Sequence, residues 1–281
     1  MGHGSVSVGS SMVPADREWQ CRSHGVRGPY SASLAWVTTL GVLAVGCTTR
    51  PVTVPIFPPL VPAPKPSVLW MEPFDVIDAQ QWREVEIQGH TQYHTVVLDG
   101  RSCLQAHSHT GASILLHAIR FDPDVYAWFS WHWRVDQLVQ GEALERKAGS
   151  DAAARVYVHF ETPGLPWQRR SLDYVWSASL PIGTVLSSAY SSTSKIIVVE
   201  SGTSSMGQWR SVERNLADDY ARCFNGHPPR VMAIGLMSDA DNTGTEALAY
   251  FDEFRISRLP TPRQQAGQVG LPVHPAESHA Q

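Results

Sequence analysis

Arg155-Val-Tyr-Val-His-Phe160 alternates residue by residue, as a β-strand does. Successive side chains of a strand point to opposite faces, so Tyr157 and His159 share one face. Other short runs of aromatic or β-branched residues lie on both sides of this stretch, bounded by Gly, Pro, Ser or Asp: 126–135, 172–176, 195–200, 231–237 and 251–256. Many short strands predict an all-β fold, a single β-sandwich or jelly-roll domain.

Helical periodicity is scarce along the chain. The best example is the segment 212–224, in which Val212, Leu216 and Tyr220 fall on one side. The sequence therefore predicts one short helix beside the β-domain.

The amino-terminal region has the pattern of an export signal. Residues 33–46 carry no charge, and Arg17, Arg22 and Arg27 precede them. Small residues lead to Cys47, which resembles a bacterial lipobox in which the cysteine becomes lipidated. We predict a signal and lipobox region over 1–47, with a plain signal peptide or an uncleaved anchor as the alternatives. Met12 is an alternative start.

A proline-rich linker is expected to follow the anchor. Seven prolines fall within 48–67, which prevents both helix and sheet and favours an extended tether. The β-domain is then expected at 68–259, and the polar tail 260–281 is expected to be disordered. These segments predict a lipid-anchored protein of the cell envelope, on the periplasmic side. The outer membrane is preferred because Thr48, not an aspartate, follows Cys47.

Charge and cysteine content narrow the function. The net charge of −4 gives no electrostatic basis for binding nucleic acid. After processing, Cys103 and Cys223 are the cysteines of the folded part. They are either a disulfide or two separate thiols, and no Cys/His spacing typical of zinc occurs.

Acidic residues suggest a structural Ca²⁺ near the ends of the domain. Asp239 and Asp241 begin an oxygen-rich turn, although Tyr250 stands where an EF-hand needs its glutamate. In a jelly roll, acids of the first and last strands can share an ion. Candidates for these positions are Glu72 and Asp75 at the start and Asp252 at the end. The alternative is a solvated turn whose side chains cap their own backbone.

Aromatic residues on the expected strands could form a ligand-binding platform. Its candidates are Trp131, Trp133, Tyr157, Tyr174 and Trp176. If their faces line one concave sheet, they suit sugar rings or another flat ligand, with Arg134 and Arg155 as hydrogen-bond donors. The alternative is that these aromatic residues fill the core of the sandwich.

No catalytic motif stands out in the sequence. Asp173, Glu213 and Asp239 could supply the paired carboxylates of a glycoside hydrolase, but only if two of them face one cleft. Neither a GxSxG elbow nor a GxGxxG phosphate loop occurs. The sequence thus favours a non-catalytic module over an enzyme.

Five segments resemble a bacterial family, the domain of unknown function 3047. They occur in the expected order: 129–135, 150–158, 172–176, 213–220 and 238–244. The resemblance implies an exported, mostly β domain and carries no agreed activity, so no catalytic residue is transferred. The family usually has two acids where this chain has Ser150-Asp151. A more distant likeness to galactose-binding-like jelly rolls rests on the acids of the first and last strands.

The leading expectation is an envelope lipoprotein whose β-sandwich binds a glycan or another envelope component, with Ca²⁺ as a structural ion. Two other functions stay open. One is a hydrolase that acts on glycans through paired carboxylates, and the other is a purely structural envelope protein.

Overall fold

The computed structural model describes residues 65–163 and 169–261. The predicted signal and lipobox region 1–47 with Cys47, nearly all of the proline-rich segment 48–67, and the tail from 262 lie outside the described residues. Within the described part, none of the helices has the length and hydropathy needed to cross a membrane.

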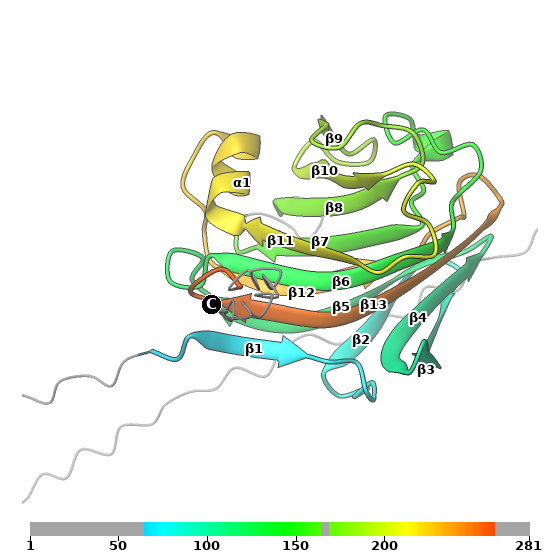
Figure 1. Ribbon diagram of the computed structural model, residues 1–281. Coiled ribbons are helices and arrows are strands. Elements are labelled where there is room, and N and C mark those ends of the chain that lie inside the picture. Colours follow the sequence, from blue (N-terminus) through cyan, green and yellow to red (C-terminus); the bar gives the residue numbers. More distant parts are fainter. Residues whose placement is uncertain (1–64, 164–168, 262–281) are drawn as a thin grey trace, which may run out of the picture. The chain divides into compact units, whose positions relative to one another are not determined.

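Two sheets pack face to face as a β-sandwich (Figure 1). The six-stranded sheet has the order β11-β6-β13-β4-β3, with β1 beside β13. Its strands are β1 (Val68–Glu72), β3 (Thr91–Leu98), β4 (Arg101–His109), β6 (Trp128–Gln137), β11 (Arg210–Asn215) and β13 (Glu246–Ser257). The all-β prediction is confirmed.

The seven-stranded sheet has the order β2-β5-β12-β7-β8-β10-β9. Its strands are β2 (Trp82–Gln88), β5 (Ala112–Phe121), β7 (Ala154–Phe160), β8 (Ser171–Ser177), β9 (Val185–Ser187), β10 (Ser194–Ser201) and β12 (Val231–Met237). Strands β8 and β10 run parallel, and the other pairs of this sheet are antiparallel.

The last strand, β13, joins the two ends of the domain. Its first half pairs with β4, its second half pairs with β1, and its other edge lies against β6. Glu72 of β1 lies opposite Phe254. The first and last strands are therefore neighbours, as the jelly-roll expectation requires.

The helix α1 (Leu216–Phe224) begins later than the sequence pattern predicts. The Asn215 side chain accepts hydrogen bonds from the backbone N–H groups of Ala217 and Asp218 and so caps the first turn. Val212 lies in β11 instead, opposite Trp131 of β6. Pairing with a neighbouring strand therefore overrides the helical period before the cap. A single 3₁₀ turn, η1 (Lys147–Gly149), lies between β6 and β7.

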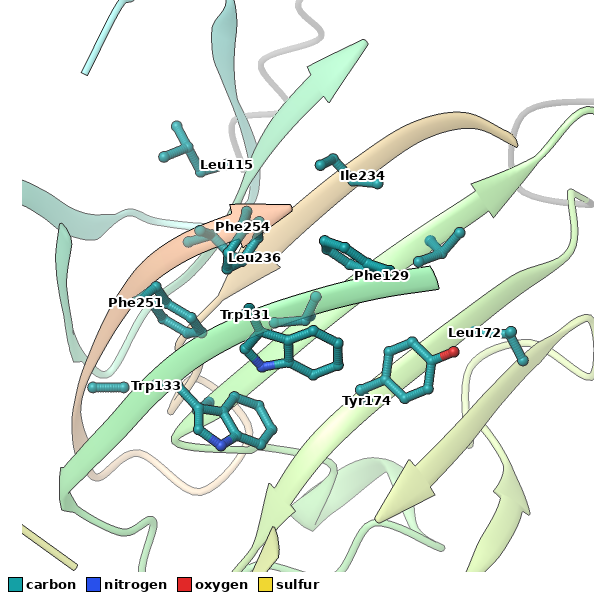
Figure 2. Packing of buried hydrophobic residues seen from close by; sticks show 14 of the residues in the cluster. Leu115, Phe129, Trp131, Trp133, Leu172, Tyr174, Ile234, Leu236, Phe251 and Phe254 are labelled. Atoms are coloured by element: carbon teal, nitrogen blue, oxygen red, sulfur yellow. The ribbon is translucent and has the colours of Figure 1, made fainter. Parts of the chain in front are cut away.

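Aromatic side chains from both sheets fill the core (Figure 2). Trp131 of β6 packs on Tyr174 of β8 with ring centroids 5.3 Å apart, and Trp133 packs on Trp176 at 6.0 Å. All four side chains are at most 1% exposed. The prediction that these four form a binding platform is wrong, because their faces are the ones that the two sheets press together. Tyr157 alone of the five candidates points to the other face of its sheet.

The loop between β6 and β7 covers part of the outer face of the seven-stranded sheet. Leu144 from this loop is fully buried in a second apolar cluster. The cluster also contains Ala152, Val175, Ile196 and Val198. This cover ends beside β7 and leaves a hollow across the next part of the sheet.

The two cysteines of the described residues, Cys103 and Cys223, are separate thiols. Cys103 is buried and Cys223 is half-buried, and neither forms a disulfide. Burial raises the pKa of both thiols to about 11, so neither has the thiolate character of a reactive cysteine.

Candidate functional site

The hollow on the outer face of the seven-stranded sheet is a pocket of about 460 Å³. Strand β7 forms its floor, because the residues that alternate with the core residues Val156 and Val158 point into it: Arg155, Tyr157 and His159. Such a volume lies within the range of small-molecule sites. The alternation in the sequence thus separates a core face from a pocket face on a single strand.

Arg155 is a deeply buried, positively charged group of the pocket. Its side chain is only 4% exposed, and its Nη2 donates a hydrogen bond to the Ser150 carbonyl at 3.0 Å. Its ion-pair partner is Asp239, whose Oδ2 lies 3.6 Å from Nη2. Its Nε has no hydrogen-bond partner among the described residues. Burial lowers the pKa of Arg155, but the nearby Tyr157, Asp239 and Asp173 raise it by more than burial lowers it. The guanidinium therefore stays charged.

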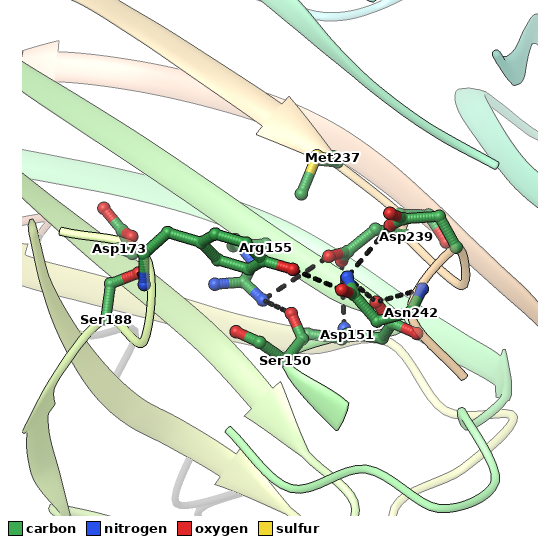
Figure 3. A network of polar contacts seen from close by, with 12 residues as sticks. Ser150, Asp151, Arg155, Asp173, Ser188, Met237, Asp239 and Asn242 are labelled. Atoms are coloured by element: carbon green, nitrogen blue, oxygen red, sulfur yellow. Dashed lines mark hydrogen bonds and ion pairs between the residues drawn. The ribbon is translucent and has the colours of Figure 1, made fainter. Parts of the chain in front are cut away.

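The turn after β12 forms one end of the pocket and is held by Asp151 (Figure 3). One Asp151 oxygen accepts from the Thr243 backbone N–H at 2.8 Å and from the Thr243 hydroxyl at 2.7 Å. The other oxygen accepts from the Asn242 side-chain amide at 2.8 Å. The turn ends at Gly244 with a φ of 63°, which glycine adopts without strain. Asp151 therefore has a structural role in shaping the wall.

Asp239 and Asp241 of this turn line the pocket. Asp239 is 3% exposed and accepts a hydrogen bond from the Ala152 N–H at 2.9 Å. Burial raises the pKa of Asp239 to about 7, although the charge of Arg155 lowers it. Burial and the charge of Asp151 also raise the pKa of Asp241. The turn can thus change its charge near neutral pH.

Asp173 of β8 lies on the other side of Arg155 in Figure 3. It is 2% exposed, and its two oxygens accept hydrogen bonds from the Ser171 hydroxyl at 2.8 Å and the Ser194 hydroxyl at 2.5 Å. Each carboxylate oxygen therefore already has a short hydrogen bond from a hydroxyl group.

Two aromatic rings on β7 lie next to each other on the floor of the pocket. Tyr157 and His159 are stacked, with centroids 5.6 Å apart and an angle of 9° between the ring planes. Burial lowers the pKa of His159, so its imidazole is neutral at pH 7. His159 Nε2 is buried and has no hydrogen-bond partner within the described ranges.

Tyr190 comes to the rim from the loop between β9 and β10. It is 58% exposed, and its hydroxyl bonds to the Asn242 side-chain oxygen on the acidic turn. The Lys147 ammonium lies 5.5 Å from the centre of its ring. The exposed ring thus bridges two loops at the edge of the pocket.

The predicted calcium ligands fall in two separate places. Asp239 and Asp241 lie together with Asp151, and one oxygen of each is within 4.8 Å of the others. Across residues 65–163 and 169–261, this is the single group of three or more His, Cys, Asp or Glu side chains that could share an ion. Calcium here stays a prediction. Asp151 already accepts several hydrogen bonds, and Arg155 lies near Asp239, so a cation would compete with both.

Glu72, Asp75 and Asp252 do not form the predicted group, although their strands are adjacent. The Glu72 oxygens accept from the Phe74 N–H at 3.0 Å and from the Trp82 indole at 2.9 Å. Asp252 is 2% exposed and pairs with the Arg101 Nε at 2.6 Å, while Asp75 is exposed. Arginine and indole donors thus occupy the places that a cation would need.

Among the hydrolase candidates, Asp173 and Asp239 line one pocket, whereas Glu213 lies on β11 of the other sheet. Sequence reasoning missed Tyr190, Asn242 and Ser194. Asn242 belongs to the oxygen-rich turn, and Ser194 directly precedes the predicted strand 195–200. Nothing in the sequence places either residue beside β7. Arg155 was named as a donor, and the structure places it in the pocket.

The fold and this pocket define an all-β sandwich protein with a polar hollow on the outer face of one sheet. The chain belongs to the DUF3047 family of proteins of unknown function, whose model matches residues 80–255. No curated protein has a sequence that matches the chain significantly.

Solved structures with a similar arrangement have low sequence identity. One is the CBM22-1 xylan-binding domain of Paenibacillus barcinonensis Xyn10C, with 14% identity and a TM-score of 0.33 over 68% of this chain and 93% of that chain. Another is the xyloglucanase domain of NopAA from Sinorhizobium fredii, with 7% identity and a TM-score of 0.34 over 68% of this chain and 100% of that chain.

A third similar structure is much longer than this chain. The match to the Endo-D glycoside hydrolase domain from Streptococcus pneumoniae R6 has 8% identity and a TM-score of 0.35, and covers 64% of this chain but 22% of that one. Because identity and structural similarity to these proteins are low, only the pocket of this chain can indicate its function.

Proposed function

We propose that the protein is a glycan-binding module of the cell envelope, and that a sugar residue occupies the pocket on the outer face of the seven-stranded sheet. The observation that carries the proposal is the set of polar side chains that line a single hollow of about 460 Å³: Arg155, Asp173, Asp239 and Asn242. Sugars offer hydroxyl groups that need planar polar partners of this kind, and such sites use a few placed polar groups to fix orientation.

The aromatic residues of the pocket support the same function. A sugar ring has an apolar C–H face, and burying that face against an aromatic ring is favourable. Tyr157 offers a ring on the floor, and Tyr190 offers an exposed ring at the rim. A ligand would therefore be held from two sides.

The expected anchor fits this function as a separate part of the proposal. A lipid on Cys47 and the proline-rich segment 48–67 would hold the sandwich away from the membrane surface, with the pocket free to reach a neighbouring polymer. Labelling with a radioactive fatty acid tests it. Label that is absent when Cys47 is replaced by Ala supports the anchor, and label that persists counts against it.

Binding is tested with isothermal titration calorimetry against a panel of neutral and acidic oligosaccharides. We expect one or more to bind, and we expect Tyr190→Ala to weaken that binding about tenfold. Ile182→Ala, an exposed residue outside the pocket, is the matched control and should leave binding unchanged. If no member of the panel binds, the proposed function is wrong.

Hydrolysis of a glycan is a second candidate, and one observation favours it. Asp173 and Asp239 line the same pocket, and a carboxyl group with a pKa of about 7 suits a general acid. The test is the release of reducing ends from the oligosaccharides that bind. Release by the wild type that Asp239→Asn abolishes would support hydrolysis, and binding without release would exclude it.

A further inference from the structure

We propose that the sugar bound by this pocket carries a carboxylate, as a uronic acid does, and that Arg155 is the anchor for that carboxylate. The inference rests on the proposed glycan-binding function and specifies its ligand. It comes from the hydrogen-bonding groups that the pocket leaves unused.

The unused groups on the pocket wall are nitrogen atoms. Arg155 Nε, Arg169 Nε and His159 Nε2 all line the pocket, are buried, and have no partner in the described part of the chain. The two guanidinium N–H groups can only donate, and the imidazole nitrogen donates in one of its tautomers. A buried donor without a partner is unfavourable, so a ligand that supplies acceptors gains a hydrogen bond from each donor that it reaches.

The acceptors of the pocket, by contrast, are largely engaged. Both Asp173 oxygens accept hydrogen bonds from serine hydroxyls. One Asp239 oxygen accepts from the Ala152 N–H, and the other faces Arg155 at 3.6 Å. A ligand that brings many donors would have to displace these bonds, whereas a ligand that brings acceptors would not.

Arg155 is suited to a carboxylate because no carboxylate of residues 65–163 and 169–261 forms a hydrogen bond with its charge. Its hydrogen bond within these ranges goes to a neutral carbonyl, and the Asp239 oxygen at 3.6 Å is beyond hydrogen-bond distance. Guanidinium and carboxylate form two parallel charge-assisted bonds, which are about twice as strong as neutral ones. The burial of Arg155, with 4% of its side chain exposed, also keeps water from weakening such a pair.

Several carboxylates surround Arg155 and would compete with a ligand for it. Those that face it are Asp239 and Asp241 on the turn, Asp151 behind them, Asp173 on β8, and Glu142 from the β6–β7 loop. The Asp239 carboxylate, with Oδ2 at 3.6 Å from Arg155 Nη2, would compete with a ligand carboxylate for this guanidinium.

The test compares tri-galacturonate with its fully methyl-esterified form by calorimetry. The two probes share one sugar backbone, and esterification removes the charge of each carboxyl group, adds a methyl group, and prevents bidentate pairing with a guanidinium. We expect tri-galacturonate to bind at least tenfold more tightly. We expect Arg155→Met to remove that preference, and Arg134→Met to keep it, since Arg134 lies on the outer face of the other sheet.

Two further variants keep the inference testable if Arg155→Met fails to fold. Arg155→Lys keeps the charge but loses the fork, so the preference should fall without vanishing. Asp239→Asn removes the competing carboxylate, so it should strengthen binding of tri-galacturonate severalfold and leave binding of the ester unchanged. If Asp239→Asn leaves both probes unchanged, the role of Arg155 is wrong.

The outcomes separate the inference from the proposed function. Equal binding of the acid and the ester, or binding of neutral oligosaccharides alone, overturns the inference and leaves glycan binding standing. Failure of every oligosaccharide overturns the proposed function. Acetate that competes as strongly as tri-galacturonate would mean a general anion site and would overturn both.

Discussion

The outer faces of the two sheets each carry an arginine with carboxylates nearby, but the two arginines differ in how well they are paired. On the six-stranded sheet, Arg134 donates to Asp136 at 2.6 Å and to Asp99 at 2.7 Å. On the seven-stranded sheet, Arg155 has one neutral acceptor, and the nearest ion-pair oxygen is 3.6 Å away. The more deeply buried arginine is thus the less well paired.

This difference separates a surface whose polar groups are paired with one another from a pocket whose polar groups are available to a ligand. A paired network on a sheet surface satisfies its own groups and leaves nothing for a ligand. A buried group without a partner costs stability, and such groups are concentrated at sites that bind ligands. The same alternating strand pattern therefore gives a structural surface on one sheet and a candidate binding pocket on the other.

The largest expected effect is on the core that both faces share. Trp131→Ala should lower the free energy of unfolding by about 3 to 5 kcal/mol, because the indole is 1% exposed and packs between the sheets. Urea unfolding measures the change. Tyr190→Ala, which removes an exposed ring, should cost about 0.5 kcal/mol or less. A stable Trp131→Ala protein that only loses binding would restore the platform hypothesis.

Asp239→Asn should stabilise the protein at alkaline pH. The folded pKa of about 7 is above the ordinary value of 3.8, so the folded state holds a proton that the unfolded state has lost. Stability from this group is greatest at low pH and falls as the pH rises towards 7. At pH 8 the variant should be more stable by roughly 2 to 4 kcal/mol, and the gain should shrink towards pH 5.

Urea unfolding at both pH values checks this prediction, with Asp218→Asn as the control. Asp218 is exposed on α1, and its replacement should give no gain that depends on pH. A gain for Asp239→Asn that is equal at pH 5 and pH 8 would mean that Asp239 titrates normally in the folded protein.

Removal of calcium should have a smaller effect on stability, and variants of the acidic residues would show where the ion binds. If Ca²⁺ binds at Asp151, Asp239 and Asp241, a chelator should lower the melting temperature by a few degrees, as mass action predicts. Asp241→Asn should abolish the response to chelator, and Asp252→Ala should preserve it. Differential scanning fluorimetry measures both. A melting temperature that calcium and chelator leave unchanged would remove the ion from the description.

The smallest expected effect concerns the link across the rim. Tyr190→Phe removes the hydroxyl that bonds to Asn242 and keeps the ring. We expect a change in oligosaccharide affinity of about threefold or less, compared with about tenfold for Tyr190→Ala, because the ring supplies most of the contact. Equal losses for the two variants would show that the hydroxyl, and the loop it ties down, matters more than the ring.

The sequence predicted local structure well and long-range contacts poorly. The alternation at 155–160 and 172–176 predicted strands that became β7 and β8, because the period of two is a local property. The same alternation does not tell which face meets the other sheet, so the sequence leaves Trp131 and Trp176 open between a binding surface and the core. Only the packing of two sheets decides that.

The candidate site depends on contacts between distant parts of the chain. Asp151 and Asn242 are 91 residues apart, and Tyr190 and Asn242 are 52 apart. Neither spacing has a sequence pattern. The prediction that acids of the first and last strands share an ion also depended on a distant contact that the sequence does not show. Asp252 pairs with Arg101 of β4 instead. The acidic turn could be predicted because its oxygen-bearing side chains lie close together in the sequence.

The most direct test of the difference between the two faces is an NMR titration that follows the arginine Nε–H resonances while tri-galacturonate is added. We predict that the Arg155 resonance shifts with saturation and that its hydrogen exchange slows, while the Arg134 resonance stays in place. A shift of Arg134 with Arg155 unchanged would place the ligand on the wrong sheet and contradict the assignment of the pocket.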